Sequence, residues 1–315
     1  MQIVQAPRAS AIIYSLLVRA KDKRPWLLPA NICPIVPITF LKARVPFQLV
    51  DISAKTRHMD LEQAKALIHE RPFGGLLYAH TYGETSTPND FFESIKSEFP
   101  DLLMIDDRCL CIPDTEPDST NTADVQLYST GYAKIVELNF GGYAFLREGF
   151  DYQPAHLPFD PKDHEEIEKS YKAAVAARAR FFYQDSGWLE TNTPVPTWNN
   201  YVERLEKKLL QSLEQRLSLN QIYASALPEE IQLPGGFQNW RFNIRVKNKQ
   251  HILDRIFAAG LFASSHYASL AGIMDEGTAP QAEALAGNVI NLFNDHHFTV
   301  AQAEQVCQVI LENLD

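Results

Sequence analysis

The sequence contains one lysine in surroundings that are unusual for a charged side chain. Lys134 follows the apolar pair Leu127-Tyr128 and a turn of small residues that begins at Ser129, and the glycine pair Gly141-Gly142 comes after it. A lysine forms a Schiff base with an aldehyde only when its amine is neutral, a state that burial or neighbouring cations favour. Most lysines are solvated, so this position between an apolar strand and a glycine pair makes Lys134 a candidate catalytic residue.

Two adjacent carboxylates end another apolar run. Asp106 and Asp107 follow Met104-Ile105, which is typical of a buried strand. A carboxylate at the carboxyl end of a strand in an α/β sheet points into the crevice where ligands bind. Because neighbouring residues of a strand face opposite sides, one acid can face the crevice while the other faces away. The alternative is that the pair caps a turn or a helix after the strand.

A third segment could bind an anion. Ala9 and Ser10 begin an expected helix over residues 9–20, directly after Arg8. Small or hydroxyl residues at the start of a helix leave backbone N–H groups free for a phosphate. The alternative is an ordinary serine cap without a ligand.

The bulk composition is that of a globular protein. The chain has 315 residues, of which 45% are apolar and 22% charged, enough for a large core and two domains. The net charge of −10, with no basic stripe, argues against nucleic acid or an anionic membrane as a partner. No apolar run has the length of a membrane span, and the N-terminus does not resemble a signal peptide. The four cysteines lack CxxC spacing, which predicts reduced thiols in the cytoplasm and no metal site.

The order of the expected elements indicates an α/β fold. Short apolar runs alternate with helical patterns through the first 150 residues, as in a mostly parallel sheet. Helical patterns over 161–182 and 201–226 then lead to the strand and helix order of a small α+β domain. We therefore predict a large domain over residues 1–200 and a small C-terminal domain over residues 201–315. The other expected elements are strands at 26–29, 45–50, 75–80, 101–106, 124–129, 143–147 and 240–246, and helices at 60–69, 89–98, 250–259 and 300–314.

Taken in order, several short segments resemble the sugar-aminotransferase family DegT/DnrJ/EryC1/StrS. That family has a Pro-Ala strand end, a His-x-Tyr-Gly, an acid pair, and a Ser-x-x-x-x-Lys followed by two glycines. The matching segments here are Pro29–Cys33, His80–Gly83, Asp106-Asp107, Ser129–Lys134, Gly141-Gly142, His266-Tyr267, Ala279–Glu283 and Phe298–Val300. The resemblance covers nearly the whole chain. The ordered set is specific, although no single segment is.

The resemblance implies a cofactor and a role for each matched residue. Lys134 would bind pyridoxal 5'-phosphate (PLP) as a Schiff base and later act as general base for the α-proton. Asp107 would pair with the pyridine nitrogen and keep it protonated. Cys33 stands where many relatives place an aromatic ring against the cofactor. The cofactor-binding residues that the resemblance implies are Lys134, Asp107, Ser129, Ala9, Ser10, Cys33 and His80.

The resemblance also implies a fold, an activity and partners. The fold would be that of fold-type I PLP-dependent transferases, an α/β fold with a large mixed or mostly parallel sheet and a small C-terminal α+β domain. The activity would be transfer of an amino group from a small-molecule donor to a keto acceptor. In the family, that acceptor is usually a nucleotide-linked keto-sugar of surface-polysaccharide or secondary-metabolite biosynthesis. The family also implies a homodimer.

One family segment has no counterpart in this chain. Relatives carry a Gly-x-Asn-x-Arg segment after the glycine strands, and residues 151–200 contain no such string. Two alternatives therefore remain beside sugar transamination. One is a different PLP-dependent reaction on a smaller amine or amino acid, and the other is a non-catalytic binding protein with the same fold.

The same stretch is rich in aromatic residues. Its rings are Tyr152, Phe159, Phe181, Phe182, Tyr183, Trp188 and Trp198. So many rings, interrupted by prolines, predict a packed surface, and we expect that surface at or near a symmetric dimer interface. The alternative is that the rings cover the core of the large domain.

Overall fold

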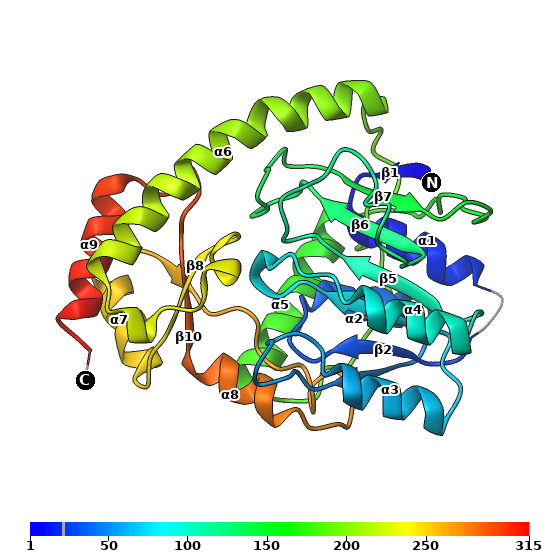
Figure 1. Cartoon of the computed structure of the whole chain (residues 1–315), viewed down its shortest axis with the longest axis horizontal. Helices are drawn as coiled ribbons and strands as arrows, with labels where there is room; N and C mark the ends of the chain where they lie inside the picture. The colour runs from blue at the N-terminus through cyan, green and yellow to red at the C-terminus, as the bar shows by residue number, and fades with distance from the viewer. Residues whose placement is uncertain (21–22, 315) are drawn as a thin grey trace.

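The computed structural model describes residues 1–20 and 23–314 and shows an α/β fold with two sheets (Figure 1). The larger sheet has seven strands in the order β1-β7-β6-β5-β4-β2-β3. Its strands are β1 (Gln2–Ala6), β2 (Trp26–Pro29), β3 (Phe47–Val50), β4 (Gly75–Ala79), β5 (Leu103–Asp107), β6 (Val125–Ser129) and β7 (Gly142–Leu146).

The strand directions bring several chain segments to one edge of this sheet. Strands β2 to β6 are parallel, whereas β7 is antiparallel to both β6 and β1. The carboxyl ends of β1, β5 and β6 and the start of β7 therefore lie at the same edge. Ligands of open α/β sheets bind at this edge.

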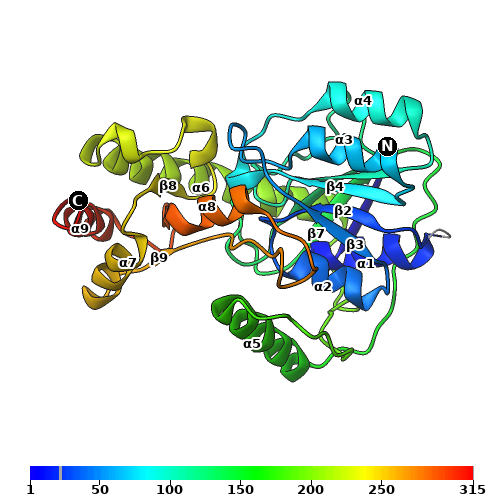
Figure 2. The same cartoon turned by 90° about the horizontal axis from the view of Figure 1, so that it is seen from below.

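Helices cover both faces of the large sheet. Helices α1 (Ala9–Arg19) and α2 (Ile35–Lys42) lie on one face, and α3 (Leu61–Glu70) and α4 (Asn89–Glu98) lie on the other (Figure 2). Successive strand residues point to alternate faces, so Ile105 of β5 packs in the α1–α2 core and Met104 in the α3–α4 core. This alternation determines the side on which each functional side chain emerges.

Residues 147–197 run along the α1–α2 side and include α5 (Pro161–Ala177) (Figure 2). The sequence predicts this helix as far as residue 182, but it ends at Ala177 because Arg178 has left-handed backbone angles, with φ of 48°. Trp188 and Tyr201 are fully buried within the chain, and Phe181 is nearly so. These rings cover the protein's own core, which was the alternative to an interface, whereas Phe182 is 79% exposed.

The second sheet has three strands in the order β8-β10-β9 and packs with helices of the C-terminal part. Helix α6 (Trp198–Ala226) extends from the large sheet to this smaller unit (Figure 1): Tyr201 packs against β6 and β7, and Tyr223 packs with β8. The remaining elements are η1 (Thr81–Gly83), η2 (Glu229–Ile231), η3 (Gly235–Gln238), β8 (Phe242–Arg245), α7 (Lys249–Ala258), β9 (Ala263–Ser264), α8 (Pro280–Asn288), β10 (Val289–Leu292) and α9 (Val300–Leu311).

One part of the C-terminal region returns to the large sheet. Leu270, Ile273 and Ala282 belong to the same buried cluster as α1 and α2. The carboxylate of Asp51 accepts hydrogen bonds from the backbone N–H groups of Gln281 and Ala282, both at 2.9 Å, at the start of α8. We propose that residues 1–200 and 201–315 form the two domains, with residues 270–282 packed on the large one.

No helix among residues 1–20 and 23–314 is long and apolar enough to cross a membrane.

Candidate functional site

The two adjacent acids at the end of β5 lie on opposite faces of the sheet, as strand alternation predicts. Asp106 is fully buried and accepts hydrogen bonds from His80 Nε2 and Asn121 Nδ2, both at 2.7 Å. Asp107 is 8% exposed and accepts a hydrogen bond from the Cys109 N–H at 3.0 Å. Asp106 therefore belongs to a structural network, while Asp107 faces the α1–α2 side, where the lysine turn follows β6.

Asp107 and Lys134 both act electrostatically on two thiols, Cys109 and Cys33. Burial raises the pKa of Cys109 well above its usual value, the negative charge of Asp107 raises it further, and the Lys134 ammonium opposes both. Burial likewise raises the pKa of Cys33, with Lys134 lowering it and Asp107 raising it. Both charges thus act on the same two thiols. The structure therefore places Lys134, Asp107 and Cys33 near one another at the carboxyl edge of the sheet, together with Cys109, which the sequence indicated only as a buried thiol. We refer to this group of residues as the crevice.

The start of α1 forms the anion-binding end of this crevice. Ser129 is the register partner of Gly142, and an ideal Cβ on Gly142 would lie 2.3 Å from the backbone nitrogen of Ala9. Only glycine permits so close an approach, which places the first turn of α1 directly beside the end of β6. The Arg8 side chain makes no capping hydrogen bond to that turn. The N–H groups of Ala9 and Ser10 and the hydroxyl of Ser129 together suit a phosphate.

This close approach makes Gly142 a sensitive position. We expect Gly142→Ala to lower the free energy of unfolding by about 1–3 kcal/mol, because the new methyl group meets backbone that cannot rotate away. Urea denaturation measures the loss. Gly287→Ala is the matched control, since a Cβ at this position in α8 has no neighbour within 4 Å. A Gly142→Ala protein as stable as the Gly287→Ala protein would contradict the packing described here.

Side chains from the C-terminal part of the chain hold the lysine turn in place. The indole Nε1–H of Trp240 donates to the Ala133 carbonyl at 2.6 Å, and Arg216 donates to the Lys134 carbonyl at 3.2 Å. Arg216 is 3% exposed and also donates to the Trp240 carbonyl and to Asn294 Oδ1, both at 2.5 Å. Neither Trp240 nor Arg216 was a candidate from the sequence, because each lies more than 80 residues from the turn.

Three stacked aromatic rings, from both parts of the chain, lie near the lysine turn. Tyr267 stacks on Trp240 with ring centroids 6.1 Å apart, and Trp240 stacks on Tyr82 at 6.5 Å. Burial raises the pKa of Tyr267 well above its usual value, and the nearby Cys33 and Asp107 raise it further. The phenol of Tyr267 therefore reaches the same group of residues as Lys134. The resemblance included Tyr267 through the His266-Tyr267 segment but implied no role for it.

Helix α5 lies at the outer side of the same crevice. Burial raises the pKa of Tyr171, and charges on Cys33 and Glu168 raise it further. Glu168 also raises the pKa of Cys33. Tyr171 packs against the α1–α2 core, so this face of α5 lies over the crevice from within the same chain. The helix occupies the part of the sequence where the Gly-x-Asn-x-Arg segment has no counterpart.

His80 lies apart from these residues. Its two ring nitrogens contact Asp106 Oδ1 and the Glu84 carbonyl, both at 2.7 Å, and its ring packs on Tyr78 of the α3–α4 core. The structure brings together Lys134, Asp107, Cys33, Ser129, Ala9 and Ser10 at one edge of the sheet, but it directs the His80 ring to the other face.

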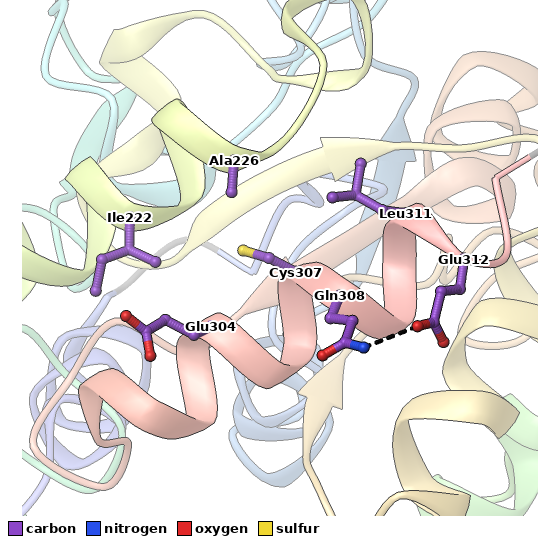
Figure 3. Close-up of a pocket in the computed structure, with 7 residues that line it drawn as sticks. All are labelled: Ile222, Ala226, Glu304, Cys307, Gln308, Leu311 and Glu312. Atoms are coloured by element: carbon purple, nitrogen blue, oxygen red, sulfur yellow. Dashed lines mark hydrogen bonds between the residues drawn. The ribbon is translucent and has the colours of Figure 1, made fainter.

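A surface groove of about 400 Å³ lies elsewhere, between α6 and α9 (Figure 3). Ile222, Ala226 and Leu311 form its apolar part, and Gln308 donates to Glu312 at 2.9 Å along its rim. The groove contains none of the residues of the crevice. It therefore offers no link to the lysine and the carboxylate.

Comparison with solved structures identifies the fold as that of PLP-dependent sugar aminotransferases. The putative sugar aminotransferase Spr1654 from Streptococcus pneumoniae, in its PLP form, is 16% identical with a TM-score of 0.72, over 99% of this chain and 88% of that chain. A DegT DnrJ EryC1 StrS aminotransferase from Brucella abortus is 16% identical with a TM-score of 0.66, over 99% and 86%. NtdA from Bacillus subtilis with bound cofactor PMP is 17% identical with a TM-score of 0.69, over 99% and 73%.

The sequence itself gives no match of this kind. No protein-family profile matches it, and no curated protein matches it. The fold that the resemblance implied is therefore confirmed by the structural comparison, and the activity depends on the site.

Proposed function

We propose that this protein is a PLP-dependent aminotransferase that transfers an amino group to a nucleotide-linked keto-sugar. The observation that carries the proposal is the crevice at the sheet edge, where Lys134 and Asp107 act on the same two partly buried thiols, Cys33 and Cys109. Perturbed groups in a crevice at the carboxyl ends of strands are a frequent mark of an active site.

The residues present fit PLP in both shape and charge. The first turn of α1, brought against β7 by Gly142, and the Ser129 hydroxyl offer donors to a phosphate. Asp107 has an ionisable carboxylate, held by the Cys109 N–H, that suits a protonated pyridine nitrogen. Lys134 offers a primary amine between them. Hydrogen-bond donors for the phosphate, a carboxylate for the ring nitrogen and an amine for the aldehyde are the three groups that this cofactor requires.

When bound, PLP supplies an aldehyde that combines with amines and a ring that accepts electrons from the carbon bearing the amino group. The Asp107 carboxylate would hold the proton on the ring nitrogen. Lys134 Nζ would take the proton from the carbon of the amino donor and return one to the acceptor. Tyr267, Trp240 and helix α5 would keep water away from these transfers, since they form the walls of the crevice.

The substrate class is the finer part of the proposal. Solved structures with this fold include proteins described as sugar aminotransferases from Streptococcus pneumoniae and Micromonospora echinospora. We extend that class to this chain, with a small amino acid as donor and a keto-sugar as acceptor. All four cysteines are free, which supports a reducing compartment and hence the cytoplasm.

The experiment is an absorbance titration of the purified protein with an amino donor. We expect an absorbance band near the visible–ultraviolet boundary that disappears when L-glutamate is added, with one 2-oxoglutarate released per chain. The disappearance requires amino transfer, so cofactor binding alone does not produce it. A band that no amino donor changes would favour the non-catalytic alternative, and a changed band without keto acid would favour another PLP reaction.

We also propose that two copies of the chain pair. Large exposed rings support this: Phe182 is 79% and Tyr132 is 74% exposed, and Tyr132 lies two residues before Lys134. Exposed aromatic side chains are enriched at protein interfaces. Sedimentation of the intact protein, whose chain mass is 35.7 kDa, tests the pairing.

A further inference from the structure

Three side chains with metal-binding chemistry meet beside the lysine turn. Glu137 follows that turn, and His296 and His297 lie in the turn between β10 and α9. One ligand atom from each lies within 4.8 Å of the other two. A carboxylate and two imidazoles form a ligand set that zinc and related divalent ions bind readily.

We propose that Glu137, His296 and His297 bind a divalent transition-metal ion, with zinc as the best fit. His297 Nε2 lies 3.3 Å from Glu137 Oε2. Two ligands about 2.0–2.1 Å from a zinc ion at the tetrahedral angle are themselves roughly 3.3–3.4 Å apart. The pair therefore already has the separation of two zinc ligands. The ligand atom of the exposed His296 lies within 4.8 Å of both.

The second histidine distinguishes this cluster from a simple ion pair. The rings of His296 and His297 have centroids 3.9 Å apart. Within residues 1–20 and 23–314, the His296 nitrogens have no hydrogen-bond partner in the protein. A single metal ion can bind two imidazoles placed this close together.

The surrounding structure holds the ligands in position. Asp295 is paired with the buried Arg241, and its carboxylate accepts a hydrogen bond from the backbone N–H of His297 at 3.1 Å. The Glu137 side chain is 7% exposed and accepts a hydrogen bond from the Ala133 N–H at 3.0 Å. The first contact fixes the backbone at His297, and the second holds the Glu137 carboxylate as outer contacts hold ligands in known metal sites. A neighbouring cavity of about 110 Å³, lined in part by Glu137, His296 and Lys208, has room for water to complete the coordination.

The position of the site gives it a structural consequence. Glu137 is bonded to Ala133, the residue before Lys134, and the two histidines belong to the small domain. A bound ion would therefore link the lysine turn to the small domain. The sequence predicted no metal site, because the cysteine spacing gave none and Glu137 is 160 residues from His297.

The test is calorimetric titration of zinc chloride into the untagged, cofactor-loaded protein after treatment with a chelator. We expect one equivalent of zinc to bind, and His297→Asn or Glu137→Gln to weaken binding by about 100-fold or more, since each removes a ligand. His69→Asn is the matched control: His69 Nε2 also lies 3.3 Å from a carboxylate, that of Glu98, but without a second histidine. This variant should bind zinc as the unchanged protein does.

Cobalt(II) provides a second measurement on the same variants. Visible bands at longer wavelengths than those of the cofactor should appear in the unchanged protein and be lost in His296→Asn. Because His296 is exposed, we expect this variant to fold as the unchanged protein does. Absence of stoichiometric zinc binding, or equal zinc affinity in His297→Asn and the unchanged protein, would overturn the proposal. Metal binding is read directly, so the result does not depend on transamination.

Discussion

Lys134→Ala is expected to lose both the absorbance band and all covalent attachment of PLP. The lysine amine is the group that would bond to the aldehyde, and Lys134 is placed in the crevice with Asp107, Cys33 and Cys109. Treatment of the unchanged protein with borohydride makes that bond permanent, so a digest should yield one labelled peptide, the one containing Lys134. The amino-donor reaction of the variant should fall by several orders of magnitude, as it does when a central catalytic group is removed.

Lys169→Ala serves as the control for this result. Lys169 is an exposed residue of α5 whose ammonium lies 4.0 Å from Glu165. Its replacement should leave the band, the label and the reaction rate unchanged. A label found on any lysine other than Lys134 would show that the wrong residue has been assigned.

Asp107→Asn is expected to slow the amino-donor reaction by orders of magnitude while PLP still binds. The amide cannot hold a proton on the pyridine nitrogen, so the ring accepts electrons less readily. Its neighbour in the fold, the Cys109 N–H, can donate to the amide oxygen as it does to the carboxylate, so we expect little loss of stability. Single-turnover absorbance with L-glutamate measures the rate.

Asp106→Asn should have the opposite effects, with a larger loss of stability and a smaller change in reaction rate. Asp106 is fully buried and bonded to His80 and Asn121, so its change should lower the free energy of unfolding by about 1–3 kcal/mol. The rate per folded molecule should change much less than in Asp107→Asn. If Asp106→Asn has the larger effect on the rate, the two acids have been assigned in the wrong order.

Much of the fold could be predicted because its signals are local. The parallel strands are short apolar runs, and the alternation of their residues places Asp106 and Asp107 on opposite faces. Strand β1 was missed because it is an edge strand with an exposed start, Gln2-Ile3. Helix α2 was missed because it contains Pro37 and is apolar on most sides, so it lacks the polar face of a typical surface helix.

The residues of the site also divide into those that local sequence could identify and those that only the packing of distant segments reveals. Lys134, Asp107 and Ser129 follow strands and could be identified from their neighbours in the sequence. Trp240, Arg216 and Tyr267 reach the crevice only through the packing of the small domain, and no local pattern carries that information. The resemblance implied a direct contact between His80 and the cofactor. Both ring nitrogens of His80 instead contact Asp106 and the Glu84 carbonyl, so its hydrogen bonds do not support that contact.

The hydrogen bonds from Trp240 and Arg216 to the lysine turn have a thermodynamic consequence. Because the lysine turn is held by Trp240 and Arg216, separation of the proposed C-terminal domain would also free the lysine. Any ligand that needs Lys134 in place must then favour the docked state, by about 2.7 kcal/mol when its concentration is about 100 times its Kd. Cofactor supply would thus favour the docked state, and partial opening of the molecule would remove these hydrogen bonds from the lysine turn before the large sheet unfolds.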